Sequence, residues 1–461
     1  MQDLKHLSKN KRTLGLGLIN IDRSNRNLLR AGERPSARFS LPPGKRRDHL
    51  KFLLIFIAIV LALTPVSILI FRKATSAVRV SATWIHSQLT PALKEAEAAK
   101  QPPVSSFEMA SALLANAAGP VDQLTAKNTE GQVFHYTVRG DLQKRVHDFM
   151  ATNRVPYGVV VAIEPVSGRI LAMTSYSSVD PDWSKSAFYD LYPMASLFKI
   201  ITASAALESK KITPETVIEF RGRATSENPR YWAISPKGKN DRLDVTYAMS
   251  KSINPVYGRL ACDIAGKALV MACANRFGFN QELFPGTSAK ESKAAEPQSN
   301  NGLMLMGAGL DHEVKISPLH AAAMMAAIAN GGRMMAPALT DRITSGNGDN
   351  KELFRPREIR SLVSPETAAA LTHMLSRTVT SGTSRRAFHD RRGRPRLHVD
   401  IAAKTGSING SDPRGHYSWF AAFAPVRNPQ IALVALVINQ DKWKIKSSQV
   451  GEQALEEFFN P

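Results

Sequence analysis

The chain has 461 residues, and 43% of them are hydrophobic, which is ample material for a large buried core. Lysine and arginine outnumber aspartate and glutamate by 60 to 39, so the formal net charge is +21 at pH 7. This balance favours an anionic partner, such as nucleic acid, anionic lipid or an acidic polymer, without choosing among them. Two cysteines, Cys262 and Cys273, exclude a disulfide-dense scaffold and a cysteine-rich zinc site. The sequence leaves open whether they form a disulfide or are two small buried residues.

The N-terminal part predicts a membrane anchor. Residues 1–51 are polar, basic and irregular, and we expect a flexible tail that can lie against anionic lipid. Residues 52–71 contain no charge, and twenty helical residues span a hydrocarbon core of roughly 30 Å. A buried core helix is seldom apolar on every face, and a cleaved signal peptide has a shorter apolar run. We therefore predict one transmembrane helix over residues 52–71.

The charges that flank this helix predict its orientation. The twenty residues before it contain six lysines and arginines, and the twenty after it contain three. Since the more basic flank stays in the cytoplasm, we expect a single-pass protein of the inner (plasma) membrane with a cytoplasmic N-terminus. The large remainder of the chain is then periplasmic or extracellular, and we expect no nucleic-acid partner.

Residues 72–132 predict a short helical stalk broken at Pro102 and Pro103, and residues 133–461 predict a globular domain. That domain begins with an alternating strand at 133–138 and a helix at 140–152. A strand–turn–strand pattern follows, and three strand-like runs occur near the C-terminus. Together they predict an α+β fold with one five-stranded antiparallel sheet covered by helices. Its strands are expected at 157–164, 169–177, 398–407, 416–426 and 431–439.

Two further helices have clear sequence signals. Ser317 can cap a helix whose first turn contains Pro318, and Gly331 with Gly332 ends it. Met324 and Met325 within it are expected to fill the core. A last helix is predicted at about 448–459.

The first candidate catalytic pair is Ser196 and Lys199. They open a largely apolar helical run, and residues three apart share a helix face, so the lysine amine can lie beside the serine hydroxyl. A serine becomes a good nucleophile when a base removes its proton, and lysine can do this if burial or a nearby cation lowers its pKa. The spacing alone proves little, because Ser8 and Lys11 in the predicted tail match it by chance. The apolar context makes a solvated surface pair the less favoured alternative.

Two weaker motifs follow. Ser252 and Asn254 precede a helical run; the hydroxyl can relay a proton, and the amide can bind a peptide bond, although both residues are also ordinary helix caps. Lys404 with Thr405, Gly406 and Ser407 ends a predicted strand. A strand edge can pair with an extended peptide, a glycine lets it approach, and the cation and hydroxyls suit a carboxylate. A polar strand end before a turn is the equally good alternative.

Taken in this order, the three motifs resemble those of penicillin-binding proteins of the serine D,D-transpeptidase superfamily. The resemblance covers roughly residues 135–460. It extends to several further sites: Tyr192-Pro193, Ile316-Ser317-Pro318, Asn330-Gly331-Gly332, Gly382-Thr383 and Trp419-Phe420.

The resemblance implies a role for each motif residue. Ser196 attacks the D-Ala-D-Ala carbonyl, Lys199 is the base, Ser252 relays a proton to the leaving D-Ala, and Asn254 holds the substrate amide. Lys404 supports the electrostatics. Thr405 and Ser407 bind the terminal carboxylate beside Gly406, and the N–H groups of Ser196 and Ser407 form the oxyanion hole.

The same resemblance implies stem peptides as substrate, β-lactams as covalent inhibitors, and the membrane and wall-synthesis proteins as partners, with no metal and no cofactor. Residues 74–132 are too few for a glycosyltransferase domain. Met194 and Ala195 stand where many large members have Pro-Gly, a pattern closer to D,D-carboxypeptidases. A carboxypeptidase or β-lactamase therefore remains an alternative to a transpeptidase. A β-lactam sensor or wall-peptide scaffold without turnover is the other.

Overall fold

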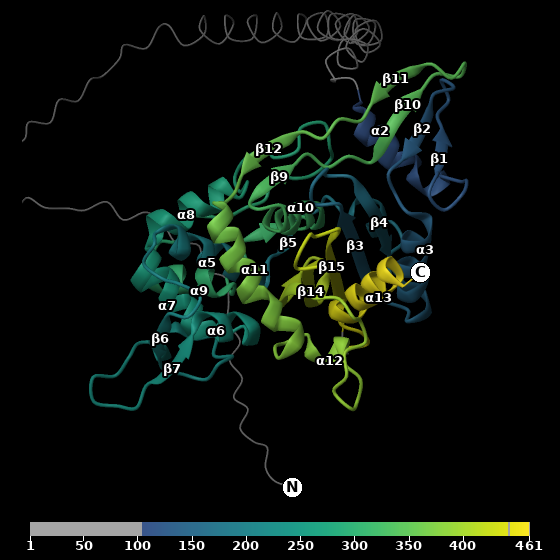
Figure 1. Ribbon diagram of the computed structural model, residues 1–461. Helices are drawn as coiled ribbons and strands as arrows, with labels where there is room; N and C mark the ends of the chain where they lie inside the picture. Colours follow the sequence, from purple (N-terminus) through teal and green to yellow (C-terminus); the bar gives the residue numbers. More distant parts are fainter. Residues whose placement is uncertain (1–103, 441–442, 461) are drawn as a thin grey trace, which may run out of the picture. The chain divides into compact units, whose positions relative to one another are not determined.

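The computed structural model describes residues 104–440 and 443–460 (Figure 1). The predicted basic tail, the predicted membrane helix and most of the predicted stalk lie outside these residues. Within the described ranges, no helix combines the length and apolarity needed to cross a membrane.

One five-stranded antiparallel sheet forms the centre of the described chain, as predicted. Its strand order is β13-β14-β15-β3-β4, so the hairpin from early in the chain pairs with strands from its end. The α+β fold is therefore confirmed. The strand bounds are Tyr157–Ile163 for β3, Ile170–Tyr176 for β4, Ala402–Ser411 for β13, Arg414–Ala424 for β14 and Ile431–Asn439 for β15.

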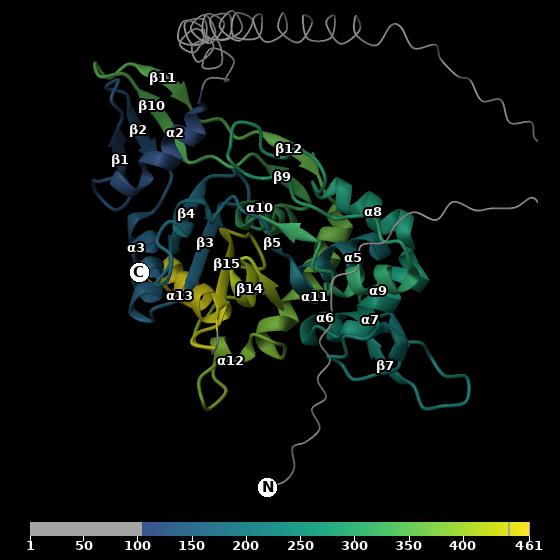
Figure 2. The same cartoon turned by 180° about the vertical axis from the view of Figure 1, so that it is seen from behind.

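Helices cover both faces of this sheet (Figures 1 and 2). Because successive side chains of a strand point to opposite faces, Val159 and Val161 join the core cluster that contains α10 (Pro318–Ala329). Val160 and Ala162 join the second cluster, with α3 (Gly140–Thr152) and α13 (Ser447–Phe459). Burial on both faces explains why these strands read as continuous apolar runs.

The helix α10 begins and ends where the sequence predicts. The Ser317 hydroxyl accepts a hydrogen bond from the backbone N–H of His320, and Pro318 occupies the first turn. The chain then leaves the helix through Gly331 and Gly332, both with positive φ. Met324 and Met325 are completely buried, which confirms their predicted place in the core.

Residues 104–132 differ from the expected helical stalk. They contain α2 (Ser106–Leu113), but also a strand, β1 (Thr125–Lys127), which pairs with β2 (Val133–Tyr136). Both strands belong to a second sheet of order β1-β2-β10-β11. Side chains of α2 and β1 are buried in the same core as the large sheet, so residues 104–132 and the predicted domain from residue 133 form one compact unit. The predicted strand at 133–138 is present, but in this smaller sheet.

The remaining elements surround the large sheet or form the helical region beside it. The helices are α4 Trp183–Ser186, α5 Phe198–Glu208, α6 Val245–Lys251, α7 Asn254–Arg259, α8 Lys267–Arg276, α9 Asn300–Ala308, α11 Pro365–Thr380 and α12 Arg385–Phe388, with shorter or π-helical turns η1 Leu114–Asn116, η2 Ala195–Leu197, η3 Pro229–Tyr231 and η4 Leu260–Ala265. The strands are β5 Tyr192–Pro193, β6 Val217–Phe220, β7 Asp241–Asp244, β8 Lys315–Ile316, β9 Arg333–Met335, β10 Thr340–Thr344, β11 Asn350–Leu353 and β12 Glu358–Ser361.

The two cysteines are free thiols in this structure. Cys262 is half-buried in η4, and Cys273 is buried in α8. Burial raises the pKa of the Cys273 thiol to about 12, so it behaves as a small apolar residue. The sequence left open a disulfide or two packed thiols, and the structure contains the two thiols.

His320 is a buried polar residue of α10 that the sequence did not single out. Its Nε2 lies 2.8 Å from the Phe277 carbonyl oxygen, and its Nδ1 lies 2.7 Å from the Ser292 hydroxyl. Since a carbonyl can only accept, Nε2 bears the hydrogen and Nδ1 accepts from Ser292. Burial lowers the pKa of His320 to about 4. The ring is therefore held neutral as a structural hydrogen-bonding group.

This burial predicts a pH-dependent stability. Between pH 6.5 and about 4 the unfolded chain binds a proton at His320 that the folded chain excludes. The free energy of unfolding should therefore decrease as the pH is lowered from 6.5 to about 4. His320 should account for up to about 3 kcal/mol of this decrease. In detergent, the melting temperature of the full chain should drop more between pH 7 and 5 for wild type than for His320→Gln. The exposed His373→Gln serves as the control, and an equal drop in all three proteins would contradict the prediction.

Candidate active site

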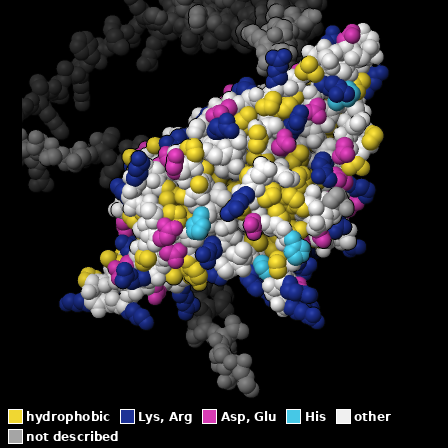
Figure 3. Space-filling view, in the orientation of Figure 1, with side chains coloured by type: hydrophobic (Ala, Val, Ile, Leu, Met, Phe, Trp, Pro, Cys, Tyr) yellow, Lys and Arg dark blue, Asp and Glu magenta, His cyan; other side chains and the backbone are white. Residues whose placement is uncertain are grey.

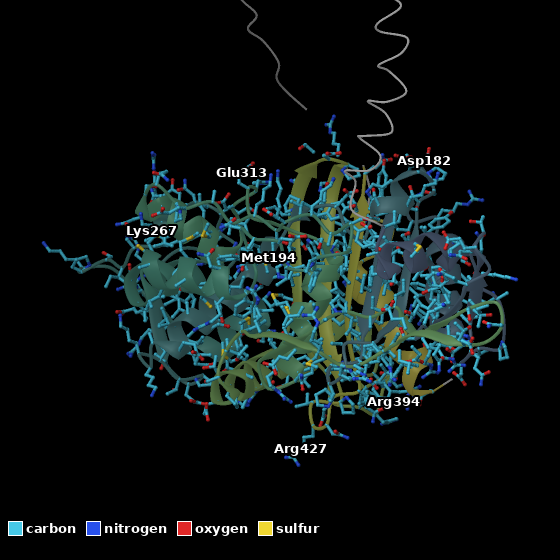
Figure 4. The ribbon with its side chains drawn as sticks, turned by 90° about the horizontal axis from the view of Figure 1, so that it is seen from above. Asp182, Met194, Lys267, Glu313, Arg394 and Arg427 are labelled. Atoms are coloured by element: carbon cyan, nitrogen blue, oxygen red, sulfur yellow. The ribbon has the colours of Figure 1, made fainter. Side chains whose placement is uncertain are left out.

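The turn that presents Ser196 is held from two sides. Before it, β5 pairs with β8, and Met194 N–H donates to the Val314 carbonyl at 2.9 Å. The indole Nε1 of Trp419, on β14, donates to the Pro193 carbonyl at 2.9 Å. Figure 4 labels Met194, which lies between the teal helices and the yellow strands. The turn of residues 193–197, called the nucleophile turn after the role expected of Ser196, is thus fixed at the junction of the sheet and the helical region.

Within this turn, the backbone is constrained. Ala195 has φ of +53°, a left-handed conformation that ordinary residues rarely adopt. Ser196 follows in η2, and α5 begins two residues later. The residues of α5 from Phe198 to Leu207 are all buried, which confirms the predicted burial of this helix. Burial of the whole helix removes water from around its first turn.

The Lys199 amine lies beside the Ser196 hydroxyl, as the spacing predicts. Its Nζ is 2.8 Å from Ser196 Oγ and 2.8 Å from Asn254 Oδ1, and it also contacts the Ala308 carbonyl oxygen. Lys199 is completely buried, and Ser196 is 8% exposed. These three partners are all neutral, so none of them compensates a positive charge on the lysine.

Burial lowers the pKa of Lys199 well below its usual range, and the nearby charge of Lys404 lowers it further. Both effects disfavour the ammonium form, the first by loss of hydration and the second by repulsion. The sequence argument required one of these two causes, and the structure contains both. A buried neutral amine within hydrogen-bond distance of a serine hydroxyl is the arrangement that general-base activation requires.

Ser252 and Asn254 reach this site from a sharp break between two helices. Ser252 has φ of +58° and ends α6, while Asn254 begins α7. The left-handed residue reverses the chain and lets both side chains approach the lysines. Asn254 Oδ1 accepts from Lys199, and Asn254 Nδ2 donates to the Ser226 carbonyl at 3.2 Å. Its side chain is thus a partner of the lysine, and not a helix cap.

Lys404 brings the third motif to the second. Its Nζ donates to Ser252 Oγ at 2.9 Å and to the Thr405 carbonyl at 2.7 Å. Lys404 is completely buried, and burial lowers its pKa to about 7. Near neutral pH this amine therefore exchanges between charged and uncharged forms while it remains bonded to a hydroxyl.

The third motif lies on β13, which is the edge strand of the large sheet. The strand continues for four residues beyond Ser407, to Ser411, so the prediction that this motif ends the strand before a turn is wrong. A side chain at Gly406 would place its Cβ 3.3 Å from Ser196 N and 3.1 Å from Ala195 Cβ, so glycine lets this strand pack on the nucleophile turn. Thr405 is partly buried, and its hydroxyl is hydrogen-bonded to that of Thr383. Ser407 is exposed beyond them.

All eight predicted site residues therefore lie in or beside one cluster of contacts around Ser196. Sequence reasoning assigned no role to several residues that complete it. The Ala308 carbonyl and Ser226 hold Lys199 and Asn254, and Thr383 holds Thr405. A backbone carbonyl leaves no signature in the sequence, whereas the closely spaced Gly307 and Gly309 are a signal that could have indicated a tight approach.

Gly309 offers a direct test of the nucleophile turn. It has φ of +69°, and a Cβ there would lie 2.2 Å from Ala195 O and 2.8 Å from Ser196 Cα. Gly309→Ala should displace Ser196 and slow its reaction with labelled penicillin by about 100-fold. Gly331 is a matched control, because its φ is +67° and a Cβ added there would meet nothing within 4 Å.

We expect Gly331→Ala to lower the free energy of unfolding by about 1 kcal/mol through backbone strain alone and to keep normal labelling. Equal labelling rates for the two variants would show that the Gly309 contact does not position Ser196.

Several known proteins resemble this chain. A peptidoglycan D,D-transpeptidase PbpA of Mycolicibacterium smegmatis is 28% identical over 358 residues, which cover 68% of this chain and 69% of that protein. The protein of the same name from Mycobacterium tuberculosis is 29% identical over 314 residues, or 61% of this chain and 62% of that protein. The chain thus spans about two thirds of the length of these relatives.

Solved structures have the same fold. Penicillin-binding protein A of M. tuberculosis, solved as a ceftriaxone acyl-enzyme complex, matches with a TM-score of 0.59 and 25% identity, over 70% of this chain and 79% of that chain. A D,D-transpeptidase domain from Eggerthella lenta matches with a TM-score of 0.61 at 24% identity, over 78% and 91% of the two chains.

The family assignment covers most of the described chain. The sequence profile described as the penicillin binding protein transpeptidase domain matches residues 158–460. This range includes the five strands of the large sheet, apart from the first residue of β3, and all three motifs around Ser196. The chain belongs to the penicillin-binding protein transpeptidase family.

Proposed function

We propose that this protein is a peptidoglycan D,D-transpeptidase, which cross-links wall stem peptides through an acyl-enzyme at Ser196 and is inhibited by β-lactams. The observation that carries the proposal is the Lys199 amine, which is buried 2.8 Å from the Ser196 hydroxyl and has no anionic partner among the described residues. The named activity of the mycobacterial relatives supports the same reaction.

The proposed base is the neutral form of Lys199. A neutral amine has two hydrogens and one lone pair. Asn254 Oδ1 and the Ala308 carbonyl accept the two hydrogens, so the lone pair is directed at the Ser196 hydroxyl. Lys199 takes the hydroxyl proton as Ser196 Oγ bonds to the carbonyl carbon of the penultimate D-Ala.

The negative charge then moves to the carbonyl oxygen, where we assign its stabilisation to the N–H groups of Ser196 and Ser407. Collapse of this intermediate breaks the peptide bond and leaves an ester on Ser196. The departing nitrogen needs a proton. Ser252 donates its own proton and regains one from Lys404, to which it is hydrogen-bonded. The free D-Ala leaves as an amine.

In the second half, the amine of a neighbouring stem peptide attacks the ester carbon. The attacking nitrogen gives up one proton, which returns to Lys404 through Ser252, and the new amide bond forms. The Ser196–acyl bond breaks, and Ser196 Oγ takes back its proton from Lys199. The position of β13 at the edge of the sheet supports an extended peptide as the substrate, because edge strands can pair with a peptide backbone. We assign the binding of the terminal carboxylate to Thr405 and Ser407, which both belong to β13.

The proposal includes a place in the cell. We infer that residues 52–71 anchor the chain in the inner (plasma) membrane, with residues 1–51 in the cytoplasm and the transpeptidase domain outside. Wall-synthesis proteins would then be its partners. Wall peptides are cross-linked on that outer side, so the proposed orientation agrees with the proposed reaction.

The nucleophile is tested by mass spectrometry of the full chain in detergent after incubation with penicillin. We expect one covalent adduct on the wild type, located at Ser196, and none on Ser196→Ala. Loss of the adduct within minutes would indicate a β-lactamase. An adduct elsewhere, or none on the wild type, would overturn the acyl-enzyme proposal.

The acceptor is tested with a pentapeptide ending in D-Ala-D-Ala, with and without an added acceptor amine. We expect release of D-Ala together with a new cross-linked amide. Release of D-Ala with no cross-linked product would make the protein a D,D-carboxypeptidase. A stable penicillin adduct with no peptide turnover would favour the sensor or scaffold.

Lys404→Gln tests the electrostatic coupling of the two lysines. Because the Lys404 charge lowers the pKa of Lys199, its removal should raise that pKa. Lys199 would then lose its proton only at higher pH. The rate of Ser196 acylation by penicillin, measured against pH, should have its rising limb displaced to higher pH in the variant, with a lower plateau. A lower plateau with an unmoved limb would argue against the coupling.

A further inference from the structure

A cavity of about 470 Å³ lies in the segment between β6 and β7, next to the second motif. Two hydrogen bonds connect this segment to Asn254. The backbone N–H of Asn254 donates to the Ala224 carbonyl at 2.9 Å, and Asn254 Nδ2 donates to the Ser226 carbonyl at 3.2 Å. The cavity is lined by Arg221, Gly222, Arg223, Thr225, Ser226 and Tyr231. The cavity therefore adjoins Asn254, which is itself a hydrogen-bond partner of Lys199.

The walls of this cavity are anchored. Trp232 is fully buried, and its indole Nε1 donates to Ser226 Oγ at 3.1 Å. A Cβ at Gly258 of α7 would lie 2.3 Å from the Trp232 ring, so glycine lets the indole pack directly on the helix. Arg221 N–H donates to the Trp232 carbonyl at 3.3 Å and closes the segment into a loop. The loop is therefore positioned by the same helix that begins with Asn254.

Two guanidinium groups face solvent at this cavity without an acidic partner. Among the described residues, neither the Arg221 nor the Arg223 side chain forms a hydrogen bond or an ion pair. By contrast, Arg259 nearby is paired with Asp263. Glu227 lies in the same loop but does not line the cavity. Figure 3 shows further basic side chains at the tip of the loop that leads to β7.

This lining matches a carboxylate. Arginine presents several N–H donors in a fixed plane that suits the two oxygens of a carboxylate. The Thr225 and Ser226 hydroxyls can add donors, and Tyr231, which is 63% exposed, offers an apolar surface for the neighbouring peptide. An apolar ligand would leave the guanidinium groups unused.

We infer that this cavity binds a free carboxylate of the donor stem peptide, distinct from its terminal carboxylate, through Arg221 and Arg223. The inference rests on the proposed function and names a specificity determinant for it. The terminal carboxylate is assigned to Thr405 and Ser407 on β13, whereas the cavity adjoins Asn254. A second anchor at the Asn254 side would hold the peptide at two points and align the scissile bond between them.

The test uses the full chain in detergent and two synthetic pentapeptides ending in D-Ala-D-Ala. One has a free side-chain or α-carboxylate before these residues, and the other has the same group as an amide. The proteins are wild type, the double variant Arg221→Gln/Arg223→Gln, and Arg230→Gln, a matched control from the same loop that does not line the cavity. Penicillin labelling of Ser196 reports the active fraction of each preparation, to which the D-Ala release rates are normalised.

For the wild type, we expect kcat/KM to be about tenfold higher for the carboxylate peptide than for the amide peptide, mainly through KM. The double variant should reduce this ratio to about one, while Arg230→Gln keeps it. A wild-type ratio near one would overturn the inference. An equal loss of the ratio in Arg230→Gln would also overturn it, because the preference would then come from general charge attraction.

The two proposals fail differently. If penicillin labels Ser196 and D-Ala is released equally from both peptides, the carboxylate site is wrong and the proposed Ser196 acyl-enzyme is unaffected. If Ser196 is not labelled and neither peptide is cleaved, the proposed function itself fails, together with the site that rests on it.

Discussion

This active site depends on a lysine amine that is held in a dry interior and has only neutral hydrogen-bond partners in the part of the chain that the structure describes. Burying a charged ammonium is costly, and a buried lysine lowers that cost by giving up its proton. The three hydrogen-bond partners of Lys199 are neutral, and the neighbouring cation is Lys404. A single carboxylate at this place would favour the ammonium form and remove the proposed base.

The fold supplies what that environment needs. The large sheet is buried on both faces, and its edge strand β13 packs on the nucleophile turn, so Lys404 enters the site from the sheet. The helices supply Lys199 from α5 and Asn254 from α7. Because each lysine comes from a different layer, neither layer alone would exclude water from the site. The close approaches at Gly309 and Gly406 are where the layers meet.

Two of the six left-handed non-glycine residues of the described chain lie at the same place. Ala195 and Ser252 both have positive φ, and both lie next to or within the motifs. Left-handed residues other than glycine cost of order 1 kcal/mol or more and persist where the surrounding structure determines them. At Ala195 that structure is the β5–β8 pair and the indole of Trp419; at Ser252 it is the bond from Lys404. These contacts offset the strain and orient the hydroxyls of Ser196 and Ser252.

The sequence by itself determined the five-stranded α+β sheet, the bounds of α10, and the residues of the three motifs. Those features depend on local signals: apolar runs with turn residues between them, a Ser-Pro helix start, and fixed short spacings. Ser196 and Lys199 are three residues apart on one chain segment, so their contact followed from helix geometry.

Only the tertiary structure decided the rest, because it depends on contacts between distant segments. The bonds from Lys199 to Ala308 and from Lys404 to Ser252 join residues that are 109 and 152 positions apart. The pairing of β1 with β2, which includes residues 125–127 in the compact unit, has no strong local pattern in so short a strand. The two thiols, the neutral His320 and the arginine-lined cavity likewise depend on what surrounds each side chain. A sequence names the ionisable groups, but burial and neighbours, which the fold supplies, set their charge and hence their chemistry.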